Sequence, residues 1–169
     1  MEVTVEVKGI NYNIHRKLMV TDEIPFTKFA RIIVTAMGWA GWRNWEFQVN
    51  NMNIMVPPDD DADREKSSSQ RLYADEINVA DVKLQTGDKF LFVYGADDHP
   101  WIHNIIIEKN HTVERSTKAN NELGRAVNHG VVLTGLLRCP RDELHPSEFE
   151  QAIEAFENDP IAYDRDWKQ

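Results

Sequence analysis

The residues best suited to chemistry in this sequence lie between two apolar segments, from Asp97 to His103. Asp97 and Asp98 are adjacent carboxylates, and His103 adds an imidazole at the start of the second apolar segment. Such oxygen and nitrogen atoms are ligands for divalent cations, and a metal so held could activate water to hydrolyse a phosphodiester or an amide. One hypothesis is therefore a divalent-metal-dependent hydrolase or nuclease, with Asp97, Asp98 and His103 as catalytic and metal-binding residues.

A structural interpretation of the same segment is favoured. Neighbouring side chains on an extended chain point to opposite sides, so Asp97 and Asp98 converge only in a tight turn. In this interpretation an aspartate caps the turn, Trp101 fills the edge of the core, and His103 bonds a neighbouring carboxylate or carbonyl group. His99 and Trp101 are then candidate binding residues rather than catalytic ones.

Two other groups of side chains are candidates for binding. Arg16 lies in the basic segment 15–17, which could make a weak local contact with nucleic acid. Trp39 begins a group of three tryptophans that could stack on bases or on a peptide. Only Arg43 is interleaved with these rings, so packing at the end of a helix is the favoured interpretation of Trp39.

The formal charge of −9 is concentrated near the C-terminus. Residues 142–169 hold two Lys and Arg against nine Asp and Glu, whereas residues 1–56 hold six against five. An acidic surface repels phosphate backbones, because nucleic-acid binding depends on Lys and Arg. The charge therefore argues against a broad nucleic-acid binder and favours a protein partner.

The expected location is the cytoplasm, with no membrane partner. No segment approaches the run of about 18 apolar residues that a membrane span requires, and residues 1–7 lack the pattern of a secretory signal. Cys139 is the single cysteine, which excludes an internal disulfide and a zinc site built from several thiolates.

The pattern of apolar residues predicts an α+β fold: a β-grasp-like mixed sheet with one main helix packed across it, plus a C-terminal helical extension. Alternating valines predict a strand over 3–7, and a second strand over 14–20 completes a hairpin. A helix is expected from about residue 26 to the stop at Gly38, with Asp22 or Thr27 as its cap. A second hairpin turns at residues 50–51, and a helical turn precedes an apolar central strand at residues 90–94.

These elements predict a single domain over residues 1–169. Its core extends over about residues 1–108, and residues 57–70 form a mobile acidic loop because they offer no core-facing stripe. The helical extension covers about residues 131–169, where Ser147 and Glu150 have the spacing of a capping box.

Several motifs resemble those of the plasmid pRiA4b ORF-3-like family, over most of the chain. They are Asn13-Ile14-His15-Arg16-Lys17-Leu18, Met37-Gly38-Trp39, Gly87-Asp88-Lys89-Phe90, Asp97-Asp98-His99-Pro100-Trp101-Ile102-His103 and Cys139-Pro140. The departures are His15 in place of the usual Trp, an apparent insertion of His99-Pro100, and residues 141–146 in place of a glycine-rich stretch. The resemblance implies a β-grasp-like α+β fold and an association with plasmids and transposable elements, without an agreed activity.

Three classes of function stay open on these residues. The leading hypothesis is a non-enzymatic protein-interaction module, which binds its partner through the acidic C-terminal surface or an exposed sheet edge. The competing class is the metal-dependent hydrolase with Asp97, Asp98 and His103. The third is an acidic decoy that occupies the basic groove of a DNA-binding protein.

Overall fold

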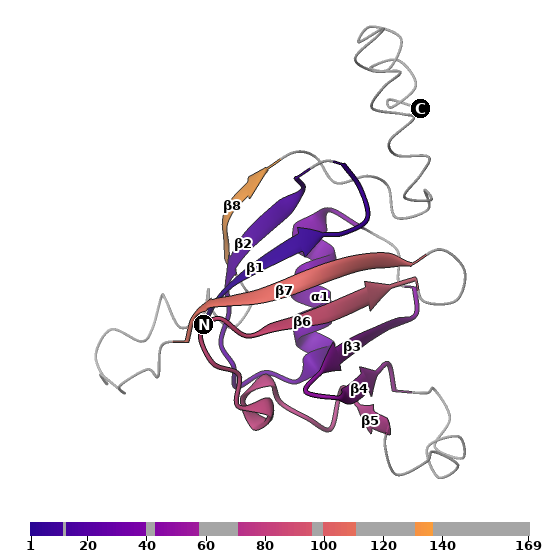
Figure 1. Ribbon diagram of the computed structural model, residues 1–169. Coiled ribbons are helices and arrows are strands. Elements are labelled where there is room, and N and C mark those ends of the chain that lie inside the picture. The colour runs from indigo at the N-terminus through magenta and orange to yellow at the C-terminus, as the bar shows by residue number, and fades with distance from the viewer. Residues whose placement is uncertain (12, 40–42, 58–70, 96–99, 111–130, 137–169) are drawn as a thin grey trace, which may run out of the picture.

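The computed structural model describes residues 1–11, 13–39, 43–57, 71–95, 100–110 and 131–136 (Figure 1). In these residues one α-helix and a short 3-10 helix accompany a mixed sheet of eight strands, an α+β arrangement. The elements are β1 (Glu2–Val7), β2 (His15–Met19), α1 (Phe26–Met37), β3 (Trp45–Val49), β4 (Met52–Met55), β5 (Arg71–Tyr73), η1 (Val79–Val82), β6 (Lys89–Tyr94), β7 (Trp101–Lys109) and β8 (Val131–Leu136).

The order of strands across the sheet is β5-β4-β3-β6-β7-β1-β2-β8. Neighbouring strands are antiparallel except for β4 and β5, which are parallel. The predicted hairpins β1–β2 and β3–β4 are confirmed, and β6 lies between β3 and β7, as expected of a central strand. Helix α1 crosses behind the sheet in Figure 1 and leaves the other face toward the viewer.

Alternation along the strands explains which side chains form the core. Val3, Val5 and Val7 all point toward α1 and are buried, as a period of two requires. The helix contributes Phe26 and Phe29, whose rings contact the ring of Phe47 on β3 at centroid distances of 5.0 and 5.6 Å. The core therefore lies between α1 and one face of the sheet.

The two ends of α1 are built differently. Gly38 ends the helix with φ 82°, and the backbone N–H groups of Gly38 and Trp39 donate to the carbonyls of Thr35 and Val34, as at many helix C-termini. At the start, the expected side-chain cap from Asp22 or Thr27 is wrong, because Pro25 occupies the N-cap position without a side-chain hydrogen bond.

Main-chain carbonyls distant in sequence replace that cap. The amides of Phe26 and Thr27 donate to the carbonyls of Ile77 and Ala74 at 3.1 and 3.0 Å. These bonds satisfy two of the amides that a helix N-terminus leaves without a partner. The segment before η1 therefore does what a local cap would otherwise do.

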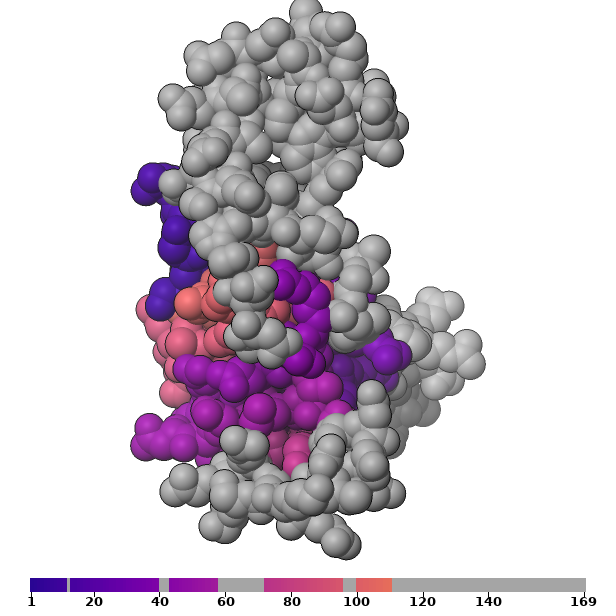
Figure 2. Space-filling view, turned by 90° about the vertical axis from the view of Figure 1, so that its right-hand side faces the viewer, coloured from indigo at the N-terminus to yellow at the C-terminus, as the bar shows by residue number. Residues whose placement is uncertain are grey.

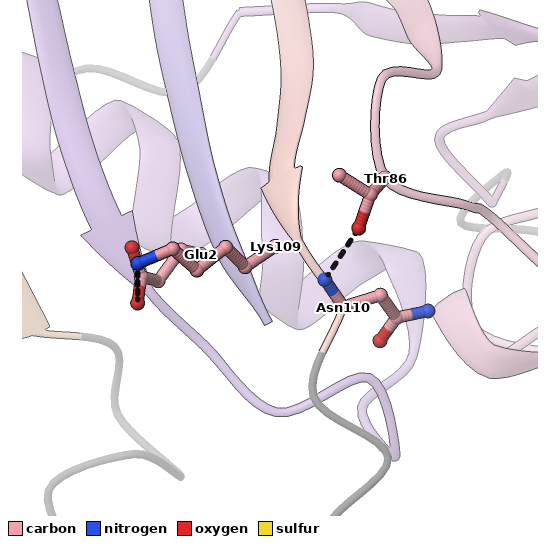
Figure 3. A network of polar contacts seen from close by, with 4 residues as sticks. All are labelled: Glu2, Thr86, Lys109 and Asn110. Carbon is pink, nitrogen blue, oxygen red and sulfur yellow. Dashed lines mark hydrogen bonds and ion pairs between the residues drawn. The ribbon is translucent and has the colours of Figure 1, made fainter.

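Polar contacts hold the far end of β7 against its neighbours (Figure 3). Lys109 Nζ lies 3.5 Å from a carboxylate oxygen of Glu2 on β1, and the backbone N–H of Asn110 donates to Thr86 Oγ1 at 3.1 Å. The ion pair is largely exposed and contributes little to stability. The contacts nevertheless place β7 between β1 and the loop that precedes β6.

The C-terminal part departs from the expected helical extension at its start. Residues 131–136 form β8, which pairs antiparallel with β2, so the predicted helix is wrong for these six residues. The rest of the extension, residues 137–169, lies outside the described residues, as does most of the acidic loop. Among the described residues no helix has the length and apolarity needed to cross a membrane.

Candidate functional site

The candidate segment connects β6 to β7. Tyr94 and Trp101 form the last pair of the two strands, and Gly95 begins the turn with φ 75°, its N–H donating to the Asn44 carbonyl at 2.7 Å. Asp97, Asp98 and His99 lie outside the described residues. The structure therefore describes the two strands that hold the segment and the side chains of Trp101 and His103.

Trp101 and His103 both point toward α1 and are fully buried. They lie two residues apart on one strand and therefore share a face. The indole of Trp39, which follows α1, lies against both: its centroid is 6.0 Å from the Trp101 ring and 5.3 Å from the His103 ring. Trp39 also stacks on Tyr94 at 4.8 Å, so these rings form one aromatic cluster at the C-terminal end of the helix.

Burial keeps the imidazole of His103 neutral. His103 Nδ1 lies 3.2 Å from the Phe92 carbonyl oxygen, and because a carbonyl oxygen only accepts, this contact assigns the proton to Nδ1. Desolvation lowers the pKa of His103 to about 4, although hydrogen bonds to the carbonyls of Phe92 and Trp101 oppose this shift. The imidazole is therefore uncharged at neutral pH.

His103 Nε2 is then an acceptor that is fully buried. It has no hydrogen-bond partner among the described residues. A buried polar atom in this state costs about 1–3 kcal/mol, so the position of His103 is maintained by packing between Trp39 and Phe92, whose centroids lie 5.3 and 5.5 Å from the imidazole. The lone pair of Nε2 could bind a metal ion by its chemistry, but the His103 side chain has no exposed surface at which an ion could reach it.

The two predicted binding residues outside this segment also have structural contacts. Arg16 lies on the helix side of β2 and donates from Nε to the Ala36 carbonyl at 3.0 Å and from Nη1 to the His15 carbonyl at 2.8 Å. A cation at a helix C-terminus is favourable because the last carbonyls of the helix carry partial negative charge. Trp39 is 6% exposed, in agreement with the favoured interpretation that it packs at the end of the helix.

Acidic and imidazole groups do not assemble elsewhere in the described part of the chain. Across these residues, no three His, Cys, Asp or Glu side chains lie close enough to hold a metal ion. The helix side of β6–β7 therefore presents a closed aromatic core, in agreement with the structural interpretation of Trp101 and His103.

The other face of the sheet, opposite α1, is called here the open face. Its center contains an aliphatic strip of four residues: Leu91, Val93, Ile102 and Ile106. Ile102 is 36% exposed, the exposed large apolar residue of the described chain, and it pairs directly with Val93 across β6–β7. Leu91 and Ile106 are half-buried on the same two strands.

Carboxylates surround the aliphatic strip and have only neutral partners among the described residues. Glu6 accepts a hydrogen bond from Asn104 at 3.3 Å, and Glu108 accepts one from Thr4 at 2.8 Å. Glu46 lies beside Val93 in the register and contacts the amide of Gln48. The open face thus combines apolar surface with unneutralised negative charge.

Sequence reasoning overlooked this face, although the signal is present in β7. Ile102, Asn104, Ile106 and Glu108 occupy alternate positions, and the two isoleucines break the polar alternation usual on the solvated face of an antiparallel sheet. The sequence alone does not show which side of β7 faces the core, because both alternating sets of its residues contain apolar side chains.

A groove of about 530 Å³ lies at the end of the open face, beside the β3–β4 turn. In Figure 2 the purple atoms of β3 and β4 lie at the surface beside the pink and orange atoms of β6 and β7. The lining residues are mostly amides: Gln48, Val49, Asn50, Asn51, Met52, Asn53, Lys89, Phe90, Leu91 and Asn104. The closely spaced asparagines at residues 50, 51 and 53 are the sequence signal for this groove.

Comparison with known proteins gives a family and a solved structure that are similar to this chain. No curated protein matches it. A crystal structure of MM3350, a protein of unknown function from Methanosarcina mazei Go1, is similar at a TM-score of 0.68 and 16% sequence identity, over 96% of this chain and 84% of that one. At this identity the likeness shows a shared fold. The profile of the plasmid pRiA4b ORF-3-like protein family matches residues 1–167, and the chain belongs to that family.

Proposed function

We propose that this protein is a non-enzymatic protein-interaction module that binds a partner on the open face of its sheet. The observation that carries the proposal is the aliphatic strip, in which Ile102 is exposed on a face that otherwise should be polar. Single exposed apolar residues are common, whereas contiguous apolar patches mark interaction surfaces. Ile102 pairs directly with Val93, which is 9% exposed, and the half-buried Leu91 and Ile106 lie on the same face, so Ile102 is the exposed part of a larger apolar group.

The charge around the strip specifies the partner. Glu6, Glu46 and Glu108 pair with no Lys or Arg among the described residues, and residues 142–169 add a net −7. A partner with an aliphatic center and a basic rim would bury the strip and neutralise these carboxylates. The partner is therefore a protein with a basic surface.

The buried imidazole supports an interaction role over hydrolysis. A metal-dependent hydrolase would require Asp97, Asp98 and His103 to meet at an accessible point. The His103 side chain has no exposed surface, and its Nδ1 bonds the Phe92 carbonyl. The interaction module needs none of these three residues to be accessible.

The proposal extends to the chain as a whole. The protein is a single domain of a mobile-element-associated family and acts in the cytoplasm, with the helical part of its C-terminal extension after residue 136. The order of hairpin, helix, hairpin and later strand supports a β-grasp-like origin for the sheet, in which β7 lies between β1 and β6. The acidic extension would add to the charge that attracts the basic partner.

The test is charge insertion on the open face. A partner identified from host lysate by mass spectrometry is purified, and its Kd is measured for the Ile102→Lys and Thr35→Lys proteins. Thr35 is exposed on α1, so its substitution adds the same charge on the opposite side of the sheet. We expect Ile102→Lys to weaken binding at least about tenfold, the size of effect at a central apolar contact, and Thr35→Lys to leave the Kd unchanged.

Two results would contradict the proposal. One is that the wild-type and Ile102→Lys proteins bind the partner with the same Kd, although the binding depends on salt. The other is a rise in melting temperature on addition of Mg²⁺ or Mn²⁺ that Asp98→Ala abolishes, since this would favour the hydrolase.

A further inference from the structure

The groove beside the β3–β4 turn has a composition that sets it apart from the aliphatic strip. Five of its lining residues carry carboxamide side chains, one is a lysine, and the other four are apolar residues of which Leu91 lies in the open-face row. We propose that this groove, the carboxamide groove, binds a small uncharged saccharide. This site adjoins the partner surface and shares Leu91 with it, but its occupancy does not depend on the proposed function.

The groove is held rigid by the strands that form it. Asn53, Gln48, Leu91 and Asn104 are successive partners across β4, β3, β6 and β7, so their side chains form one row on the open face. Directly opposed residues in such a row have Cβ atoms about 5 Å apart. The spacing of hydrogen-bonding groups is therefore fixed before a ligand arrives.

The turn at one end of the groove is equally constrained. Asn50 and Asn51 both have positive φ, 49° and 62°, as a two-residue hairpin turn requires. The amide of Asn50 donates to the Val82 carbonyl at 3.3 Å, which ties the turn to η1. Its neighbour Asn51 is exposed in the groove wall.

Several polar atoms of the groove remain available. Gln48 and Asn104 use their amide nitrogens on Glu46 and Glu6, which leaves both carbonyl oxygens as acceptors. The side chains of Asn51 and Asn53 have no partner among the described residues. Each carboxamide offers donors and an acceptor, and a sugar hydroxyl likewise both donates and accepts.

The charges favour an uncharged ligand over a phosphate. Lys89 has no carboxylate partner among the described residues and can donate to an oxygen. Glu46 and Glu6, which the groove amides contact, carry two negative charges against this one. An anionic ligand would therefore meet net repulsion. The hydroxyl groups of an uncharged ligand can instead form hydrogen bonds with both positively and negatively charged side chains.

Shape and apolar content agree with a sugar of one or two rings. The volume of about 530 Å³ lies within the usual range of ligand sites. Leu91, which lies in the open-face row, provides apolar surface against which the C–H groups of a pyranose ring can pack. The groove is open on one side, which suits a weakly bound, exchangeable ligand.

The experiment is an NMR titration of the full chain with cellobiose, maltose, lactose and N-acetylglucosamine, each followed separately. The readout is the side-chain NH₂ resonances of Asn51 and Asn53. We expect at least one of these sugars to shift both signals with a Kd of about 1 mM, the affinity typical of a few hydrogen bonds. Asn53→Leu should weaken this binding about tenfold.

The control is Gln85→Leu, which removes an exposed carboxamide outside the groove and should leave the titration unchanged. Absence of a shift with all four sugars would overturn the proposal. So would an equal loss of binding in Gln85→Leu, or a larger response to inorganic phosphate than to the sugars. Ile102→Lys leaves the groove amides in place, so loss of partner binding and loss of sugar binding are distinguishable.

Discussion

Replacing Trp101 with alanine is expected to lower the free energy of unfolding by about 3–5 kcal/mol. The indole is fully buried at the edge of the core, and the ring of Trp39 lies 6.0 Å from it. Alanine would leave a cavity that neighbouring strands cannot close, because Tyr94 and His103 are held by their own ring contacts with Trp39. The loss of unfolding free energy would therefore combine the transfer free energy of the buried indole with the cost of the cavity that remains.

The measurement is chemical denaturation with calorimetric melting of the same proteins. A loss of this size lowers the melting temperature of a chain of this length by about 6–20 °C. Ile102→Ala is the matched control, since its side chain is adjacent on β7 but faces solvent, and it should change stability by under about 1 kcal/mol. Similar losses in the two variants would show that Trp101 is not a core residue.

Stability is expected to fall by about 3 kcal/mol between pH 7 and pH 4 because of His103 alone. The pKa of His103 is lowered to about 4 in the folded protein, against about 6.5 in the unfolded chain. Between these values the unfolded state binds more protons, so stability rises with pH. The contribution is complete above pH 6.5 and is lost as the pH falls toward 4.

The control for this prediction removes the titrating group and keeps the ring. His103→Phe should have a smaller difference in unfolding free energy between pH 7 and pH 4.5 than wild type, although its stability at pH 7 is lower because the Phe92 carbonyl loses its partner. An unchanged pH dependence in His103→Phe would mean that the imidazole is hydrated in the folded state.

The parts of the fold that could be predicted rest on local signals. Val3, Val5 and Val7 alternate with polar residues, Gly38 follows a helical apolar stripe, and residues 50–51 have the composition of a tight turn. Each signal involves residues close in sequence, and each element appears in the structure. The family resemblance was likewise carried by short motifs, and it is confirmed over residues 1–167.

The parts that could not be predicted depend on contacts between distant residues. The carbonyls of Ala74 and Ile77 bond the first amides of α1, and no local pattern near residue 26 indicates this. The apolar run at residues 131–136 fits a strand or a buried helix equally well, and pairing with β2 decides for the strand.

The candidate site was only partly predictable for the same reason. His103 and Ile102 are neighbours of similar sequence context, yet one is fully buried and the other exposed. Which alternating set of β7 faces the core depends on its register with β1 and β6. The sequence therefore singled out this segment but could not show that its imidazole faces the helix.

The most direct test of this account is an NMR titration of the His103 imidazole with pH and then with Mn²⁺. We expect a neutral ring with its proton on Nδ1 down to about pH 5, and no selective broadening of the Nε2 signal by Mn²⁺. A ring that titrates near pH 6.5, or an Nε2 signal that Mn²⁺ broadens before that of His15, would contradict it and return His103 to a metal site.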